Sequence, residues 1–271
     1  MSETARVLEL AERLAREAGE LQRERYETTL EIRTKSAAID LVTEVDQACE
    51  QLIVGALAAE RPGDAIVAEE GGGSDRPDAT WRWIIDPLDG TTNYAHGYPR
   101  FCVSIGIERE GIRSVGVVYD PLLDELYCAT RGQGATLNGR PIRVSREDAL
   151  GRSLVATGFA YDVHRSPADN LDHFAAVLKR ARGIRRDGSA ALNLCYVAAG
   201  RFDGFWELEL HPWDVAAGLL LVEEAGGRIS DLSGGPPPRS GHEIVASNDR
   251  IHEALVEVLG APSRTIRERS R

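Results

Sequence analysis

The spacing of apolar residues predicts two helices near the start of the chain. In the first, apolar residues recur every three or four positions between Glu and Arg residues: Val7, Leu8, Ala11, Leu14, Ala15, Ala18 and Leu21. Residues at this spacing share one side of an α-helix, so the segment is predicted to pack on a core. A second helix is predicted from Asp46 to Ala59, because Arg61-Pro62-Gly63 then breaks the pattern.

Short apolar runs predict strands, and two of these strands end in acidic residues. Ala65 to Ala68 is predicted to be a short buried strand, and Glu69 and Glu70 follow it directly. Trp81 to Ile85 is predicted to be a second strand, which ends at Asp86-Pro87. Both strands are therefore expected to present carboxylates at their carboxyl ends.

The rest of the chain mixes strands and helices. Three segments joined by Gly, Asp and Pro turns predict an antiparallel meander: 103–107, 114–119 and 125–129. The second half is predicted to contain one strand and then several helices: 154–157, followed by 171–179, 190–199, 214–225 and 250–259. We expect one compact α/β unit with two subdomains, residues 1–145 and 146–271.

Composition narrows the function classes. The 271 residues have a hydrophobic fraction of 42% and a formal net charge of −11, which is typical of an ordinary soluble globular protein. This charge repels nucleic-acid phosphates and anionic lipids, so binding to either would need a local basic patch. Basic residues cluster near the end of the chain: Arg264, Arg267, Arg269 and Arg271. We interpret this cluster as a solvated terminus, and we expect neither nucleic acid nor membrane as a partner.

The cysteines and the apolar runs bear on redox chemistry and location. The four cysteines stand far apart without a C-x-x-C pair: Cys49, Cys102, Cys128 and Cys195. Neither a zinc cluster nor a disulfide framework is indicated, and buried reduced thiols are expected. No signal peptide is recognisable, and the longest apolar run, 215–222, is far shorter than the roughly 20 residues that span a bilayer. The sequence therefore favours a cytoplasmic protein.

The candidate chemistry is concentrated where the second strand breaks. The run Asp86-Pro87-Leu88-Asp89-Gly90-Thr91-Thr92 presents two aspartates, a glycine and two hydroxyls. D-P and D-G are also common turn formers, so a purely structural turn is an alternative. Glu69 and Glu70 end the preceding strand, and Asp214 is predicted to open a helix. Carboxylates that converge from these elements repel one another unless cations neutralise them, and an all-oxygen site favours Mg²⁺.

Two loops are candidates for binding an anion. Gly90-Thr91-Thr92 is placed to open a helix, whose first backbone N–H groups would point at a phosphate. Gly188-Ser189 leads into the predicted helix 190–199 in the same way, although an ordinary capping turn is equally open there. The sequence contains no G-x-x-x-x-G-K-[ST], so a P-loop for nucleoside triphosphates is excluded.

Two segments carry a resemblance to a known family. Residues 83–93 resemble the D-P-[IL]-D-G-T-[ST]-N signature of the inositol monophosphatase family, and Trp213-Asp214-Val215-Ala216-Ala217-Gly218 resembles its second signature, W-D-x-A-A-G. The resemblance continues in the family's order from about residue 5 to 260, through these further segments: Lys35, Asp40 to Asp46, Ala68 to Glu70, Gly188 to Ala191, and Glu223 to Gly227. Asp187 differs from expectation, because it puts an acid beside a loop that should face an anion.

The resemblance implies a fold, a reaction and a set of metal ligands. The implied fold is a layered αβαβα sandwich. Proteins of the family are usually homodimers that hydrolyse a phosphate monoester with two to three Mg²⁺ ions, and they are typically inhibited by Li⁺. The first ion would be held by Glu69, Asp86 and the carbonyl of Leu88. The second would be held by Asp86, Asp89 and Asp214, and a weaker third would lie beside Glu69.

The resemblance also implies the catalytic and substrate-binding residues. Asp46 and Thr91, together with Glu69, would orient and deprotonate a cation-activated water that attacks phosphorus in line, without a covalent phosphoenzyme. The N–H groups of Gly90 and Thr91 would hold the phosphate. The implied substrate contacts are Asp89, Gly90, Thr91, Thr92, Gly188, Ser189, Ala190, Glu207 and Asp214.

The identity of the alcohol half of the substrate depends on Glu207. It lies seven residues before Asp214, where the family has a carboxylate that accepts hydrogen bonds from inositol hydroxyls, so an inositol-1-monophosphatase is expected. Glu209 shares its face if the segment is a strand, so a shift in register is an alternative. Histidinol-phosphate phosphatase, fructose-1,6-bisphosphatase and 3′-phosphoadenosine 5′-phosphate phosphatase are alternatives within the class. A non-catalytic binding or regulatory protein on the same fold is the alternative from a different class.

Overall fold

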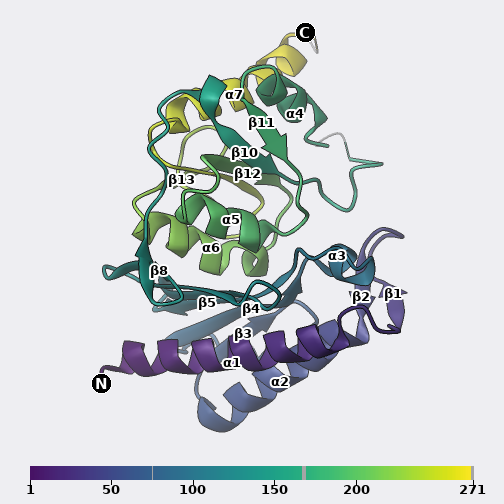
Figure 1. The fold of residues 1–271 in the computed structure, drawn as a ribbon, viewed down its shortest axis with the longest axis vertical. Coiled ribbons are helices and arrows are strands. Elements are labelled where there is room, and N and C mark those ends of the chain that lie inside the picture. The colour runs from purple at the N-terminus through teal and green to yellow at the C-terminus, as the bar shows by residue number, and fades with distance from the viewer. Residues whose placement is uncertain (75, 167–168, 270–271) are drawn as a thin grey trace.

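Helices and sheets alternate in five layers along the long axis of the molecule (Figure 1). The computed structural model describes residues 1–74, 76–166 and 169–269, with side chains described as far as residue 260. Of the basic cluster near the end of the chain, Arg271 therefore lies outside the described residues, as do the side chains of Arg264, Arg267 and Arg269.

Two long helices form the first layer. Helix α1 (Glu3–Arg25) buries the predicted apolar stripe, including Leu14 and Ala18. Helix α2 (Glu44–Glu60) begins two residues before the predicted start, because Thr43 caps it and Asp46 bonds back to the Thr43 N–H as a capping box. Both helices pack on the same sheet.

That sheet has seven strands and forms the second layer. Its strands are, in spatial order, β3 (Ala65–Ala68), β4 (Trp81–Asp89), β5 (Cys102–Arg109), β6 (Ile112–Asp120), β7 (Glu125–Thr130), β8 (Gly134–Leu137) and β9 (Arg140–Ile142). β3 and β4 are parallel, and the predicted antiparallel meander is confirmed from β5 onward. β4 does not end at Asp86 as predicted. Its ladder with β5 resumes at Asp89 after an irregularity that accommodates Pro87, so both aspartates belong to one strand.

The middle layer consists of α5 (Ala190–Ala198) and α6 (Pro212–Glu224), which lie between the two sheets (Figure 1). Two glycines of the seven-stranded sheet let α6 approach closely. A Cβ at Gly106 would lie 2.8 Å from the backbone nitrogen of Ala217, and one at Gly116 would lie 2.8 Å from its carbonyl oxygen. Because α6 touches both sheets, most of its residues are buried, in agreement with its almost uniformly apolar sequence.

A five-stranded sheet and two helices complete the stack. The sheet runs, in spatial order, β11 (Gly183–Arg185), β10 (Leu154–Thr157), β12 (Gly204–Leu208), β14 (Glu243–Ser247) and β13 (Arg228–Ser230). Helices α4 (Leu171–Leu178) and α7 (His252–Arg269) cover its outer face, and α7 extends beyond the predicted end at residue 259. The short elements are β1 (Ile32–Thr34), β2 (Leu41–Thr43), α3 (Thr91–Ala95) and the 3₁₀ turn Leu150–Arg152. The expected mixed α/β sandwich is confirmed.

Two further expectations can be compared with the structure. The four cysteines are all buried and unpaired, as predicted. Across the ranges that the structure describes, no helix has both the length and the apolar character needed to cross a membrane.

A buried histidine between β13, β14 and α7 predicts a dependence of stability on pH. His252 is fully buried, with Nδ1 2.8 Å from the Ser247 hydroxyl and Nε2 2.8 Å from the Ser230 hydroxyl. Burial lowers its pKa from 6.5 to about 4. Below pH 6.5 the unfolded chain therefore binds a proton that the folded chain does not, so stability falls as the pH drops toward 4.

The His252→Gln variant isolates this effect. We expect the free energy of unfolding of the wild type, relative to the variant, to fall by about 1–2 kcal/mol between pH 7.5 and pH 5, because only the wild type carries the titrating ring. Denaturant unfolding of both proteins at the two pH values measures the difference. Parallel pH curves for the two proteins would contradict the assignment.

Candidate active site

The predicted site residues line one pocket between the two halves of the molecule. The cavity has a volume of about 330 Å³, a size that accommodates a small molecule. Among the residues that line it are ones that follow β3, end β4 or β12, begin α3, α5 and α6, or follow β10 between Gly158 and Val163. The predicted residues among them are Glu69, Asp86, Leu88, Asp89, Gly90, Thr91, Thr92, Gly188, Ser189, Ala190, Glu207 and Asp214. Asp46 does not line the cavity but reaches it through Thr91.

The carboxylates are held in fixed orientations by neighbouring donors. The Asp86 carboxylate accepts a hydrogen bond from the Leu88 N–H at 3.0 Å. Asp89 Oδ2 accepts from the Ser189 hydroxyl at 2.5 Å and from the Ala191 N–H at 2.8 Å. Each carboxylate is therefore oriented before any ligand arrives.

Asp214 is also oriented, although it does not open its helix as predicted. Helix α6 begins at Pro212, and Asp214 accepts from the His211 N–H at 2.7 Å, so it closes a capping box at the third helical position. The helix start thereby turns a carboxylate toward the end of β4 and the start of α5, because Asp89, Ala190 and Asp214 line the same cavity.

The pocket concentrates negative charge in a buried place. Burial raises the pKa values of Asp86 and Asp214 well above the usual range, and the neighbouring carboxylates raise them further. Burial also raises the pKa of Glu69 to about 7, against the opposing effect of Lys35. The pKa of Asp89 is raised by burial too, although its hydrogen bonds from Ser189 and Ala191 oppose the shift. A bound cation would remove most of this penalty.

The donor set fits Mg²⁺. Four carboxylates and the Leu88 carbonyl supply oxygen only, which is the chemistry that Mg²⁺ prefers. Within the described residues, no three His, Cys, Asp or Glu side chains already stand at the spacing of a closed metal cage.

Lys35 partly neutralises the pocket from the side of β1 and β2. Its ammonium donates to Glu69 at 2.8 Å and also to Glu70. Burial lowers the pKa of Lys35, but the two glutamates raise it by more, so the side chain stays charged. Lys35 thus lies directly beside the Glu69 carboxylate.

The sequence analysis did not identify the buried carboxylate of Glu50. Glu50 on α2 accepts from the N–H groups of Glu70 and Gly72, each at 2.7 Å, and so fixes the turn that follows Glu69. A Cβ at Gly72 would lie 2.7 Å from the Glu50 carboxylate. The only signal was that Glu50 follows Asp46 by four residues and so shares its side of the helix.

Asp46 and Thr91 form a hydrogen-bonded pair at the edge of the pocket. The Thr91 hydroxyl lies 2.8 Å from Asp46 Oδ1 and 3.1 Å from the Leu88 carbonyl. Asp46 Oδ2 accepts from the N–H and hydroxyl of Thr43, at 2.8 and 2.6 Å. Burial raises the pKa of Asp46, and its hydrogen bonds from Thr43 and Thr91 oppose that shift. The pair can accept a proton that arrives at the Thr91 hydroxyl.

The two glutamates near β12 have different environments. Glu207 lies in the strand and is buried, and burial raises its pKa to about 8. A Cβ at Gly158 would collide with its carboxylate, so the absence of a side chain there leaves room for Glu207. Glu209 follows the strand at φ 58° and pairs with His242 at 3.1 Å. The strand alternation breaks before Glu209, so the two side chains point differently. Both glutamates line the cavity, but only Glu207 is buried.

Comparison with known sequences identifies similar proteins along the whole chain. A sequence profile described as the inositol monophosphatase family matches residues 3–262. An inositol-1-monophosphatase from Synechocystis sp. is 46% identical over 231 residues, which cover 85% of this chain and 80% of that protein. A protein named Nus factor SuhB from Pseudomonas aeruginosa is 46% identical over 262 residues, which cover 93% and 95%.

Solved structures give the same result. An inositol monophosphatase from Anabaena (Nostoc) sp. PCC 7120 superposes with a TM-score of 0.87 at 41% identity and covers 96% of this chain and 97% of that one. A structure described as an IMPase/NADP phosphatase complexed with Mg²⁺ and phosphate superposes with a TM-score of 0.84 at 25% identity and covers 95% and 96%. The likeness therefore extends over both sheets and the pocket between them.

Proposed function

This chain belongs to the inositol monophosphatase family and is therefore a phosphate monoester hydrolase, and we propose that inositol 1-phosphate is its substrate and Mg²⁺ its cofactor. The observation that carries the proposal is the pocket itself. Buried carboxylates gather there beside a hydroxyl–carboxylate pair and the starts of two helices. Such a pocket supports cation binding, water activation and phosphate binding in one place.

We assign the proposed metal ligands to the ends of β3 and β4 and the start of α6. Two to three Mg²⁺ ions would be held by Glu69, Asp86, the Leu88 carbonyl, Asp89 and Asp214. Bound Mg²⁺ would lower the pKa of a water and neutralise charge on the phosphate oxygens. A related structure that is described as complexed with Mg²⁺ and phosphate supports the choice of ion.

The protein's own groups supply the proton acceptor. The Thr91 hydroxyl receives the proton of the attacking water and passes its own to Asp46, which lies 2.8 Å away. Thr43 holds the other oxygen of Asp46, so the carboxylate cannot turn away from Thr91. Glu69 contributes by orienting the same water.

The phosphate is proposed to lie between the starts of α3 and α5. Gly90 and Thr91 begin the shorter helix, and Ser189 and Ala190 begin the longer one. The first backbone N–H groups of a helix have no acceptor within it, and those of Gly90 and Thr91 are proposed to donate to phosphate oxygens. At the start of α5 the N–H groups of Ala190 and Ala191 already donate to Asp89, so Ser189 and Ala190 are proposed to contact the substrate without supplying the main phosphate donors. Thr92 and Gly188 complete the wall of the cavity at this point.

Glu207 is proposed to recognise the hydroxyls of the alcohol. For Glu207→Gln we expect the KM for inositol 1-phosphate to rise about tenfold or more with a smaller change in kcat, because a buried carboxyl group that accepts from substrate hydroxyls is lost. Glu209→Gln is the comparison variant, since Glu209 lines the same cavity but lies beyond the strand and is paired with His242. Steady-state kinetics of both variants measure the effect, and an unchanged KM in Glu207→Gln would remove Glu207 from substrate recognition.

Further features of the proposal concern the whole protein. We propose a cytoplasmic homodimer that is inhibited by Li⁺, takes small phosphate monoesters and has no nucleic-acid or membrane partner. Residues 1–145 and 146–271 would act as two subdomains that meet at the pocket. These features rest on the family and on the net charge of −11.

A panel of substrates tests the proposal. Phosphate release is measured with inositol 1-phosphate, histidinol phosphate, fructose 1,6-bisphosphate and 3′-phosphoadenosine 5′-phosphate, each with and without Mg²⁺. We expect the highest kcat/KM for inositol 1-phosphate. A higher kcat/KM for another member of the panel would overturn the substrate assignment but keep the reaction.

One observation favours a second candidate, a non-catalytic regulatory role on the same fold. Relatives at 43% to 46% identity carry the name Nus factor. Absence of phosphate release from the whole panel would favour this second role. The intact set of proposed ligands supports the enzyme instead.

A further inference from the structure

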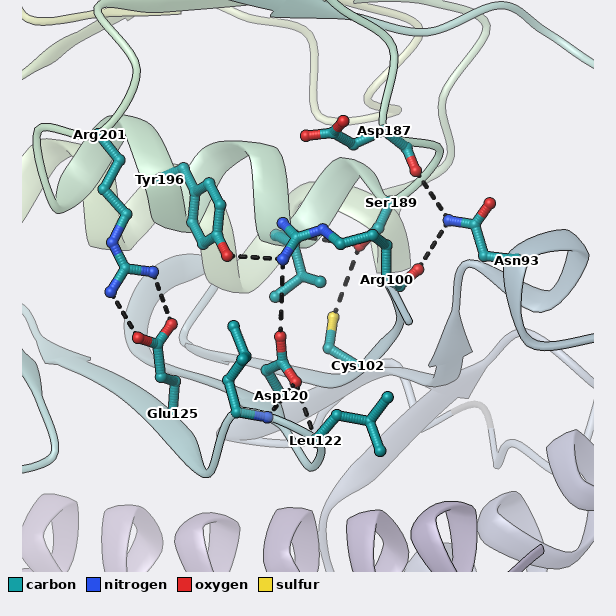
Figure 2. A network of polar contacts seen from close by, with 12 residues as sticks. Asn93, Arg100, Cys102, Asp120, Leu122, Glu125, Asp187, Ser189, Tyr196 and Arg201 are labelled. Atoms are coloured by element: carbon teal, nitrogen blue, oxygen red, sulfur yellow. Dashed lines mark hydrogen bonds and ion pairs between the residues drawn. The ribbon is translucent and has the colours of Figure 1, made fainter. Parts of the chain in front are cut away.

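The side chain of Asn93 connects two loops that are far apart in the sequence. Asn93 lies on α3, immediately after the Asp86–Thr92 run, and is buried beside the cavity. Its Nδ2 donates to the carbonyl of Arg100 at 2.7 Å and to the carbonyl of Asp187 at 2.8 Å (Figure 2). Because Asp187 precedes the start of α5, this amide ties the two anion-binding loops together.

The second loop is attached to the first at another point as well. Asp89, four residues before Asn93, accepts from the Ser189 hydroxyl and the Ala191 N–H. One end of the segment 89–93 therefore binds Asp187, and its other end binds Ser189 and Ala191. Two separate attachments fix both the distance between the two loops and their relative orientation, whereas one attachment would leave the loops free to rotate.

The loops are packed so closely that these contacts leave no room to shift. A Cβ at Gly188, which has φ +79°, would lie 3.0 Å from Asn93 Oδ1. A Cβ at Gly90 would lie 2.7 Å from the Arg100 carbonyl and 3.4 Å from the Gly188 carbonyl. Both positions require glycine, because the neighbouring loop occupies the space of a side chain.

The Arg100 carbonyl is itself anchored to α5. The guanidinium donates to the Tyr196 hydroxyl at 2.6 Å and lies over the Tyr196 ring, 4.6 Å from its centre (Figure 2). Tyr196 belongs to α5, the helix whose start faces the pocket. Both acceptors of the Asn93 amide are therefore linked to α5, one through the loop and one through Arg100.

Only a primary amide suits this position. Its NH₂ group has two protons and can satisfy two carbonyls at once. An aspartate would present oxygen to two carbonyl oxygens, and an alanine would leave both carbonyls without their donor.

We propose that Asn93 is a positioning residue that holds the start of α5 against the end of β4, so that the phosphate-binding N–H groups and Asp89 keep their relative places. The inference deepens the proposed function and rests on it for its consequence. Loss of the amide frees the Asp187–Gly188 peptide, which loosens both the phosphate contacts and the two hydrogen bonds to Asp89.

The test uses graded variants and a matched control. Asn93→Ala removes both hydrogen bonds, and Asn93→Ser keeps a hydroxyl that can donate to one carbonyl. Asn248→Ala is the control, because Asn248 is also buried and its Nδ2 also donates twice, to the Ser145 hydroxyl at 2.7 Å and the Glu147 carbonyl at 2.8 Å, while its Oδ1 accepts from the Ile251 N–H. Asn248 does not line the cavity.

We expect a loss of phosphate affinity that stability alone does not explain. In Asn93→Ala, the KM for inositol 1-phosphate and the inhibition constant of inorganic phosphate should both rise about tenfold, with a smaller rise in Asn93→Ser. Asn248→Ala should lower the Tm by a similar amount and leave both constants within about twofold of wild type. Wild-type constants in Asn93→Ala, or equal changes in both alanine variants, would overturn the proposal.

Amide hydrogen exchange separates this inference from the proposed function. Protection of the backbone amides at 188–191 should fall at least about tenfold in Asn93→Ala and stay unchanged in Asn248→Ala. If the wild type hydrolysed none of the substrates and the exchange result was as expected, the proposed function would fail. The connection between the loops would still stand. Unchanged protection in Asn93→Ala would contradict the connection whatever the activity.

Discussion

Asp89→Asn is expected to lower kcat/KM for inositol 1-phosphate by at least about a thousandfold, because it removes one negative charge from the proposed metal ligands. The substitution preserves size, and the amide oxygen can still accept from Ser189 and Ala191, so the loop at 187–191 keeps its place. The loss should therefore appear in cation binding and turnover and not in folding. Steady-state phosphate release gives the first quantity, and calorimetric titration with Mg²⁺ gives the second.

Asp187→Asn is the matched control for charge. Asp187 lies in the neighbouring loop, does not line the cavity and contributes its backbone carbonyl to Asn93. We expect its kcat/KM to stay within about twofold of wild type. Near-normal activity or unchanged Mg²⁺ binding in Asp89→Asn would contradict the assignment of Asp89 as a metal ligand.

Thr91→Val should lower kcat by about 10²–10⁴-fold with little change in KM. Valine has nearly the shape of threonine but lacks the hydroxyl, so the proton has no route to Asp46, 2.8 Å from the wild-type oxygen. The buried Asp46 keeps its hydrogen bonds from Thr43 and therefore keeps its position. Measurement of kcat and KM separates the loss of proton transfer from the loss of binding.

Thr91→Ser is the control for that variant. It keeps a hydroxyl at the same place, so most of the activity should return. Equal losses in the valine and serine variants would show that the methyl group, and not the hydroxyl, matters at this position.

Much of the fold could be predicted from the sequence where periodicity is long and regular. Helix α1 repeats its apolar pattern over many turns, and the meander from β5 to β7 has strands of six residues or more. The short strands β8, β9, β11 and β13 have three or four residues each and were not predicted. β3 and β10 are equally short but could be predicted, because each is a run without Gly, Pro or a charged residue. Each of the four missed strands contains Gly, Pro or Arg, so its neighbours in the sheet and not its own pattern decide its conformation.

The candidate site shows the same division. Acidic residues at the ends of β3 and β4 could be predicted to converge, because parallel neighbouring strands end on the same edge. The contact between Asp46 and Thr91 joins residues 45 positions apart and came only through the family resemblance. Glu50 and Asn93 bind backbone groups of distant loops, and no local pattern marks such a partner.

The register at Glu207 needed the structure for a different reason. A regular strand would place Glu207 and Glu209 on one face, but the backbone turns to φ 58° at Glu209. A left-handed conformation in a non-glycine residue departs from regular strand geometry, and no sequence pattern predicts it here. The structure therefore separates two residues that spacing alone could not.

Phosphate release from inositol 1-phosphate, measured before and after removal of divalent cations, tests whether the pocket works as a Mg²⁺-dependent phosphatase site. The purified protein is treated with a chelator and freed of it, and Mg²⁺ is then added back over a range of concentrations. We predict no release without the ion and full recovery on its return. Undiminished hydrolysis by the metal-free protein, or none at any Mg²⁺ concentration, would contradict this prediction.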